Sequence, residues 1–286
     1  MDSNKVIITS DSTTDLSPEL RERYNITTIP LSVTLGEKTY QDGVDITPDD
    51  IYEPQSKTGE FPKTAAINVD EAIAFFKPFV EAGNKVIHFG ISSEMSSTYN
   101  NTRIAAEEVG NVYVIDTQNL STGGGLLVLA AAEKAAAGMS AEDIVKEIND
   151  LVPCVDASFV IDNLDYLYKG GRCTALEMFG ANLLKLKPCI QVKNGKMGVA
   201  KKYRGRYGEV LKQYVNEQLS NPDDLITDRV FVTHAGCKPE IVESIVNQVK
   251  DTGIFKEVFL TRAGCTISAH CGADTLGVLF IRKSPI

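Results

Sequence analysis

Side-chain hydroxyls crowd residues 91–100, where the sequence ISSEMSSTYN places Ser or Thr at half of its ten positions. The segment follows an apolar run at residues 86–90 that predicts a buried strand, and it precedes a stretch typical of a helix. Ser and Thr at such a junction cap the helix. Hydroxyl groups and the N–H groups of a helix N-terminus can also hold an anion. Both interpretations stay open, and capping is the commoner outcome for any single cluster.

Catalysis by a serine nucleophile is one chemistry that this segment could support. The nucleophile elbow of hydrolases has the pattern GxSxG, because its serine sits on a strained turn between a strand and a helix. Gly90 and Ser92 match the pattern, but Glu94 occupies the position of the second glycine. His270 is the best candidate base of the three histidines, because its small neighbours leave room for a ligand. A hydrolase or transferase using Ser92 or Ser93 with His270 is therefore the alternative function.

Glycine-rich segments offer a second kind of anion site, in which backbone N–H groups surround a phosphate. Neither GxxxxGK[ST] nor a GxGxxG that follows a strand occurs in the chain. The segment STGGG at residues 121–125 precedes a predicted helix, and it suits anion binding and close helix packing equally well. Gly170 and Gly171 lie between Lys169 and Arg172, and such a glycine pair permits close backbone approach.

The elements that must position these residues alternate between strands and helices. Apolar, β-branched runs such as residues 5–9 and 86–90 are followed by helical stretches, which indicates an α/β protein with a largely parallel sheet. The Asn-Gly pair at residues 194–195 predicts a hairpin, and the second half favours a mixed sheet with helices. We expect two α/β domains, residues 1–155 and 156–286.

Polar clusters stand directly after several predicted strands. In an open parallel sheet, ligands bind in the crevice outside the carboxyl ends of the strands. We therefore expect one shared crevice, although each cluster alone also suits helix capping. The clusters are Ser10-Asp11-Ser12-Thr13, Ser92-Ser93, Asp116-Thr117, Asp162-Asn163 and His234-Ala235-Gly236.

The composition excludes several classes of protein. The 286 residues carry a net charge of −9, whereas a nucleic-acid partner requires a basic face. No run approaches the ~20 apolar residues that span a bilayer, and the first residues lack the apolar core of a signal peptide. The six cysteines form no CxxC pair, which argues against a zinc site and favours reduced thiols. We expect a cytoplasmic protein without a metal or cofactor.

Taken in order, the motifs resemble those of the DegV family, the bacterial fatty-acid-binding proteins. The resemblance covers essentially the whole chain, and it rests on the order and spacing of the motifs. The matching motifs are TSDSTTDL at residues 9–16, Pro62-Lys63-Thr64, Ser92-Ser93, SSTY at residues 96–99, VIDT at residues 114–117, Asp162-Asn163-Leu164, Lys169-Gly170-Gly171-Arg172, Lys187-Pro188, and His270 with Gly272.

The resemblance implies two α/β domains with a long acyl chain buried between or beneath them. It implies that Thr64 and either Ser92 or Ser93 hydrogen-bond the carboxylate, with Ser96 and His270 at the headgroup. Members of the family present the fatty acid to a separate kinase subunit, which makes acyl phosphate. The chain itself is therefore expected to be a lipid-binding protein and not a catalyst.

Three departures from the family pattern lie near the expected headgroup. Glu94 and Ser97 stand where glycine is usual, AAI at residues 65–67 replaces Ser-Gln-Pro, and GAD at residues 272–274 replaces Gly-Pro-Gly. A carboxylate at Glu94 would repel a fatty-acid headgroup unless it points to solvent.

The acyl tail and the partner kinase each require a further set of residues. A tail of about sixteen carbons buries CH₂ groups worth ~0.8 kcal/mol each, so the tail should supply most of the affinity. The residues expected to line the tail are Phe75, Phe76, Met178, Phe179 and Leu183. The residues expected to dock an acidic kinase are Arg172, Arg204 and Arg206.

Overall fold

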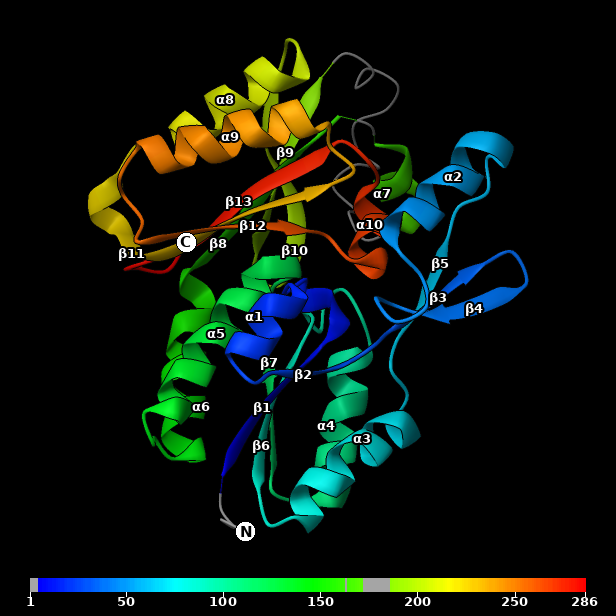
Figure 1. The fold of residues 1–286 in the computed structure, drawn as a ribbon, viewed down its shortest axis with the longest axis vertical. Helices are drawn as coiled ribbons and strands as arrows, with labels where there is room; N and C mark the ends of the chain where they lie inside the picture. Colours follow the sequence, from blue (N-terminus) through cyan, green and yellow to red (C-terminus); the bar gives the residue numbers. More distant parts are fainter. Residues whose placement is uncertain (1–4, 163, 172–185) are drawn as a thin grey trace.

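The structure is a computed structural model that describes residues 5–162, 164–171 and 186–286. The described residues form a four-stranded, a six-stranded and a three-stranded sheet. In Figure 1 the two larger sheets form the centres of two parts, and the smallest sheet stands beside them. Arg172, Met178, Phe179 and Leu183 lie outside the described residues.

A four-stranded parallel sheet forms the centre of the first part. Its strands are β1 (Val6–Asp11), β2 (Thr27–Ile29), β6 (Lys85–Gly90) and β7 (Val112–Asp116), and its helices are α3 (Val69–Glu81), α4 (Thr98–Val109), α5 (Ser121–Ala136) and α6 (Ala141–Leu151). The strands follow the order β2-β1-β6-β7, with α3 and α4 over one face and α5 and α6 over the other (Figure 1). The parallel sheet that the alternating pattern predicted is confirmed.

A three-stranded antiparallel sheet stands beside the parallel sheet. It consists of β3 (Ser32–Leu35), β4 (Lys38–Gln41) and β5 (Lys63–Ala65), in the order β4-β3-β5. Residues 26–34 read as one β-rich stretch, but they divide between β2 and β3 in two different sheets. Pro30 separates the two strands, because proline has no N–H for a ladder hydrogen bond. Helices α1 (Pro18–Arg23) and α2 (Pro48–Thr58) complete this region.

A six-stranded mixed sheet forms the centre of the second part. Its strands are β8 (Val155–Ile161), β9 (Lys187–Lys193), β10 (Lys196–Tyr203), β11 (Leu225–Ala235), β12 (Glu257–Arg262) and β13 (Thr275–Arg282). They follow the order β10-β9-β8-β13-β11-β12, in which β11 and β12 run parallel and the other neighbours antiparallel. Helices α8 (Tyr207–Gln218) and α9 (Pro239–Asp251) cover one face (Figure 1). Asn194 and Gly195, both with positive φ, form the predicted hairpin turn.

Helix α5 lies between the two large sheets and packs on both of them. Its glycines permit this close approach. A Cβ at Gly123 would lie 3.1 Å from Cβ of Ala157 in β8, and one at Gly125 would lie 2.9 Å from Cδ2 of Leu16. Close packing therefore accounts for the STGGG segment. One hydrophobic cluster runs from β1 through α5 to β13, so the core is shared by both parts.

Two short helices, α7 (Asp165–Gly170) and α10 (Cys265–Cys271), pack against each other beside the three-stranded sheet. The sequence pattern predicted neither of them. Helix α10 also contacts α2, and it lies at the junction of all three sheets (Figure 1). The described residues also form the short 3-10 helices η1 (Ser12–Thr14), η2 (Val152–Cys154) and η5 (Pro222–Asp224).

Candidate functional site

Two adjoining cavities lie along helix α10, between the parallel sheet and the six-stranded sheet. Their walls share Leu120, Met197, Ile267 and His270. The larger cavity has a volume of about 150 Å³ and contains several hydroxyl groups, and we call it the polar cavity. The smaller has a volume of about 50 Å³ and almost wholly apolar walls, and we call it the apolar cavity. The walls of both combine residues from the first and the second half of the chain.

Hydroxyl side chains and one histidine line the polar cavity. Thr64 Oγ1 lies 2.9 Å from His270 Nε2, and Ser96 Oγ lies 3.0 Å from Thr98 Oγ1. Ser97 and Ala65 are exposed, so the cavity opens to solvent at this end. The described wall contains no lysine or arginine, and hydroxyl donors would therefore have to hold an anion here. The lining residues are Leu31, Thr64, Ala65, Ala66, Ile91, Met95, Ser96, Ser97, Leu120, Met197, Thr266, Ile267 and His270.

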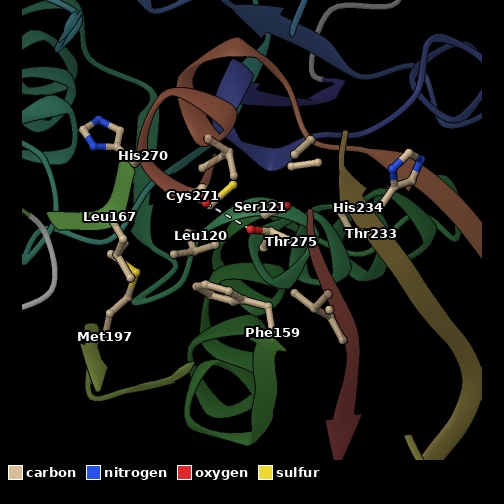
Figure 2. Close-up of a pocket in the computed structure, with 15 residues that line it drawn as sticks. Leu120, Ser121, Phe159, Leu167, Met197, Thr233, His234, His270, Cys271 and Thr275 are labelled. Atoms are coloured by element: carbon tan, nitrogen blue, oxygen red, sulfur yellow. Dashed lines mark hydrogen bonds between the residues drawn. The ribbon is translucent and has the colours of Figure 1, made fainter. Parts of the chain in front are cut away.

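The apolar cavity extends from the shared residues towards the six-stranded sheet. Figure 2 shows Phe159, Leu120 and Met197 around it, with His270 and His234 on opposite sides. Burial and the nearby Arg262 guanidinium lower the pKa of His234, so its imidazole is neutral at this wall. Such a lining suits hydrocarbon. The lining residues are Leu120, Ser121, Phe159, Leu167, Met197, Thr233, His234, Ala235, Ala263, Ile267, His270, Cys271, Thr275, Gly277 and Leu279.

Two buried carboxyl groups hold the N-terminus of α10 in place. The Gly264 N–H donates to Asp15 Oδ1 at 2.8 Å, and the Cys265 N–H donates to Asp42 Oδ1 at 2.7 Å. The Thr266 N–H donates to Asp42 Oδ2 at 3.1 Å. Burial raises the pKa of Asp15 well above its usual range. These carboxyl groups act as caps supplied from distant segments, and they fix the helix that carries His270.

Helix α7 fixes the other side of His270. A Cβ added at Gly170 would overlap Nδ1 of His270, so only glycine permits this approach. Gly171 ends α7 in the left-handed conformation with φ of 65°, which favours glycine. Gly170 and Gly171 therefore permit a close backbone approach, as the sequence suggested. The side chain that the backbone approaches is that of His270.

The hydroxyl-rich segment at residues 91–100 divides into two roles. Ser92 Oγ is fully buried and donates to the Gly195 carbonyl at 2.7 Å, which ties this loop to the β9–β10 hairpin. Ser93 Oγ donates to Asp116 Oδ2 at 2.6 Å. Neither serine belongs to the lining of the two cavities, whereas Ser96 does. Glu94 is exposed and pairs with a lysine of β10, so its carboxylate points away from the polar cavity.

The expected tail residues that the structure describes lie elsewhere. Phe75 and Phe76 are on α3, where they pack against Phe79 and His88 on the parallel sheet. Neither lines the polar or the apolar cavity. Phe159 does line the apolar cavity, and its ring faces the cavity in Figure 2.

The polar clusters after the strands mostly hold loops together. Asp11 Oδ1 accepts from the Thr13 N–H at 3.0 Å, and its Oδ2 accepts from the Ile91 N–H at 2.8 Å. Burial raises the pKa of Asp11 to about 6. Asp116 Oδ1 accepts from the Gln118 N–H at 2.9 Å. Capping accounts for these clusters, and of their described residues only His234 and Ala235 line the polar or the apolar cavity.

Further properties of the described residues concern metal-binding groups, membrane-spanning helices, free cysteines and the expected docking arginines. Within the described ranges, no group of His, Cys, Asp and Glu side chains is arranged to hold a metal ion. None of the described helices has the length and apolarity needed to cross a bilayer. The five described cysteines are buried and free, and Cys173 lies outside the described residues. Arg204 and Arg206 are exposed between β10 and α8.

Sequence reasoning missed most of the cavity lining. Met197 adjoins the predicted hairpin turn, but nothing in the sequence shows that it faces a cavity. Thr266 and Ile267 belong to α10, a helix that the pattern did not predict. The spacing of four residues between Thr266 and His270 was the available signal, because such residues share one face of a helix.

Comparison with known proteins gives matches along nearly the whole chain. The sequence model of the DegV family, described as an uncharacterised protein family, matches residues 5–283. A DegV domain-containing protein of Caldanaerobacter subterraneus subsp. tengcongensis is 30% identical over 281 residues, which cover 98% of this chain and 99% of that protein.

Solved structures show the same fold. A fatty-acid-binding DegV family protein from Thermus thermophilus is 28% identical, with a TM-score of 0.90 over 97% of this chain and 99% of that one. A stearic-acid-binding protein from Eubacterium ventriosum is 30% identical, with a TM-score of 0.82 over 96% of this chain and 98% of that one. The α/β architecture expected from the resemblance is confirmed.

Proposed function

The chain belongs to the DegV family, and we propose that it binds a long-chain fatty acid. The ligand lies between two α/β domains, which comprise residues 1–155 and residues 156–286. The carboxylate lies in the polar cavity beside Thr64, Ser96 and His270, and the tail enters the apolar cavity, whose volume of about 50 Å³ holds only part of a long chain until its walls move apart. One observation carries the proposal. A cavity lined by hydroxyl groups and open to solvent adjoins an apolar cavity that extends into the core, and the two share four residues.

The energetics favour an amphipathic acid for such a pair of cavities. About fifteen buried CH₂ and CH₃ groups contribute on the order of 12 kcal/mol before ordering costs. A hydrogen bond to a charged group contributes only ~1.5–3 kcal/mol net. The tail therefore supplies most of the affinity, and the hydroxyl groups determine the orientation of the ligand. The fatty acids bound by the relatives from Thermus thermophilus and Eubacterium ventriosum support this assignment.

The family resemblance implied that Ser92 or Ser93 hydrogen-bonds the carboxylate. In this proposal Ser96 makes that hydrogen bond instead. The Ser92 hydroxyl already donates to Gly195, and the Ser93 hydroxyl already donates to Asp116. These bonds also weaken the alternative reading of a hydrolase or transferase, because the proton of each hydroxyl is directed away from His270.

We further propose that the chain is not a catalyst, and that it presents the carboxylate to a separate kinase in the cytoplasm for acyl-phosphate formation. The exposed end of the polar cavity supports this, because a partner can reach the headgroup there. A carboxylate held by hydroxyl groups also keeps more of its nucleophilicity than one locked in a buried salt bridge.

Organic extraction of the purified full-length chain, followed by mass spectrometry, tests the proposal. We expect about one fatty acid per chain. Thr64→Val should weaken fatty-acid binding about 10-fold, because it removes one hydrogen bond to a charged group. Ser92→Ala is the matched control, and we expect its affinity to stay within about 2-fold of the wild type.

The outcome that would contradict the proposal is equally definite. A lipid-free extract together with an inability to bind added fatty acid would exclude lipid binding. Esterase turnover that Ser92→Ala abolishes would instead favour the enzyme.

A further inference from the structure

Thr266 combines deep burial with a hydroxyl group that no described residue binds. The residue is 4% exposed and lines the polar cavity. Its backbone N–H donates to Asp42 Oδ2, but its Oγ1 has no hydrogen-bond partner among the described residues. Buried hydroxyl groups are nearly always hydrogen-bonded, so an unsatisfied one requires an explanation.

Helix α10 places this hydroxyl close to the expected headgroup. Thr266 and His270 are four residues apart on α10, so their side chains lie on one face with Cβ atoms about 5–6 Å apart. His270 Nε2 lies 2.9 Å from Thr64 Oγ1. Thr64 and Thr266 thus line the same cavity, and His270 lies beside Thr64 and one helical turn from Thr266.

We propose that Thr266 Oγ1 donates a hydrogen bond to the ligand carboxylate and forms, with Thr64, the second arm of a hydroxyl clamp. The inference deepens the proposed function and rests on it. A carboxylate has two oxygens and about four acceptor sites, so one headgroup can bridge donors on both sides of the cavity. The ligand then satisfies the hydroxyl that the protein leaves unbound.

The clamp also specifies the class of ligand. Because the described wall has no lysine or arginine, selectivity comes from donated hydrogen bonds to an ionised carboxylate. Such bonds are roughly twice as strong as those between neutral groups. A fatty acid should therefore depend on Thr266 more strongly than a fatty alcohol of the same length.

Thr266→Val separates this role from a structural one, because the two roles change stability in opposite directions. Valine has nearly the same shape and lacks the hydroxyl group. If the hydroxyl serves only the ligand, its removal relieves an unsatisfied buried group, and the delipidated variant should be at least as stable as the wild type. A structural hydroxyl would make the variant less stable.

The experiment uses the delipidated full-length chain, with hexadecanoate and hexadecanol as probes in a fluorescence displacement titration. We expect Thr266→Val to bind hexadecanoate about 10-fold more weakly and hexadecanol about 3-fold more weakly. Thr266→Ser keeps the hydroxyl and should bind hexadecanoate within about 2-fold of the wild type. Urea unfolding of the delipidated proteins supplies the stability comparison.

The possible failures are distinguishable. A wild type that binds neither probe would overturn the proposed function and this inference with it. A wild type that binds hexadecanoate while Thr266→Val binds it equally well would overturn the clamp alone. A Thr266→Val variant that is less stable when delipidated, or that loses equal affinity for both probes, would show a structural role instead.

Discussion

His88 is a titratable side chain in the apolar interior of the parallel sheet. Its Nδ1 lies 3.0 Å from Thr9 Oγ1 on the neighbouring strand, and the rings of Phe75 and Phe76 pack against it. The residue is fully buried, and burial lowers the pKa of His88 to about 3. The imidazole is therefore neutral near pH 7 and can be accommodated in the core.

Mild acid should destabilise the protein through His88. The folded pKa is about 3, whereas the unfolded chain regains a pKa of about 6.5 and so binds the proton more tightly. The contribution to stability is complete above pH ~6.5 and is lost as the pH falls towards 3. Between pH 7.5 and 5.0, the wild type should lose about 2 kcal/mol more unfolding free energy than His88→Leu. Urea unfolding at both pH values measures the difference.

The contribution of Asp11 to the unfolding free energy changes with pH in the opposite direction to that of His88. The two contributions must therefore be separated. Burial raises the pKa of Asp11 to about 6, so its carboxyl binds a proton more tightly in the folded state. Stability from Asp11 therefore increases as the pH falls from about 6 towards 4. This contribution is common to the wild type and His88→Leu and cancels in the comparison. Parallel pH profiles would contradict a neutral buried His88.

Residue types identified part of the candidate site and left the rest open. Thr64 and His270 lie together at 2.9 Å, as their shared place in the family motifs suggested. Ser92 and Ser93 were named on the same grounds, yet their hydroxyls bond to protein groups. A hydroxyl can cap a helix, hold a loop or bind a ligand. The partner in space decides between these roles, and the sequence does not specify that partner.

At the scale of elements, the contact between α7 and α10 determines the orientation of His270. Because a Cβ at Gly170 would overlap the imidazole, Gly170→Ala should push the ring away from Thr64 Oγ1. We expect the variant to bind hexadecanoate about 3- to 10-fold more weakly, since one hydrogen bond at the headgroup is lost or misaligned. Displacement titration of the delipidated chain measures the effect.

Gly208→Ala is the matched control for the same substitution. Apart from adjacent residues and the backbone of α8 itself, no described atom lies within 4 Å of a Cβ added at Gly208 in that helix, and alanine favours a helix over glycine by roughly 0.5–1 kcal/mol. This variant should keep the wild-type affinity and be at least as stable. If Gly170→Ala also kept the wild-type affinity, the glycine contact would not set the orientation of His270.

The length of an element decided whether the sequence could predict it. Helix α8 (Tyr207–Gln218) has twelve residues, which is long enough to show an apolar period in the sequence. Helix α10 has seven residues and no side-chain cap of its own. Asp15 and Asp42 bind its first N–H groups from more than 200 residues away. A helix that is stabilised in this way has no local signal to detect.

At the scale of the whole molecule, the apolar cavity depends on the assembly of distant segments. Leu120, Phe159, Met197 and Leu279 come from four elements or loops, and they meet because α5 packs on both large sheets and brings the two halves of the chain together. An apolar residue that lines a cavity has the same sequence signature as one in a solid core. The aromatic face of α3 was therefore a reasonable prediction for the tail, although it packs on its own sheet.

The charge distribution of the whole molecule suggests how a partner could approach. The chain carries a net charge of −9, yet residues 201–206 have the sequence KKYRGR. Lys201 pairs with Glu217 at 2.7 Å, whereas Arg204 and Arg206 extend this basic segment on the exposed loop that follows β10. The same strand contributes Met197 to both cavities. We propose that the two arginines steer an acidic surface of the proposed partner kinase towards the ligand site.

Charge reversal tests this steering. Arg204→Glu with Arg206→Glu should slow association with the kinase about 10-fold or more at low salt, and the difference should shrink as ionic strength rises. The fatty acid that co-purifies should not change, because neither arginine lines a described cavity. Lys146→Glu with Lys250→Glu gives the same change in net charge on exposed positions of α6 and α9 and should leave association nearly unchanged. If both pairs of substitutions slowed association equally, net charge alone would matter. If the variant with Arg204→Glu and Arg206→Glu supported acyl-phosphate formation at the wild-type rate, the two arginines would be excluded from docking.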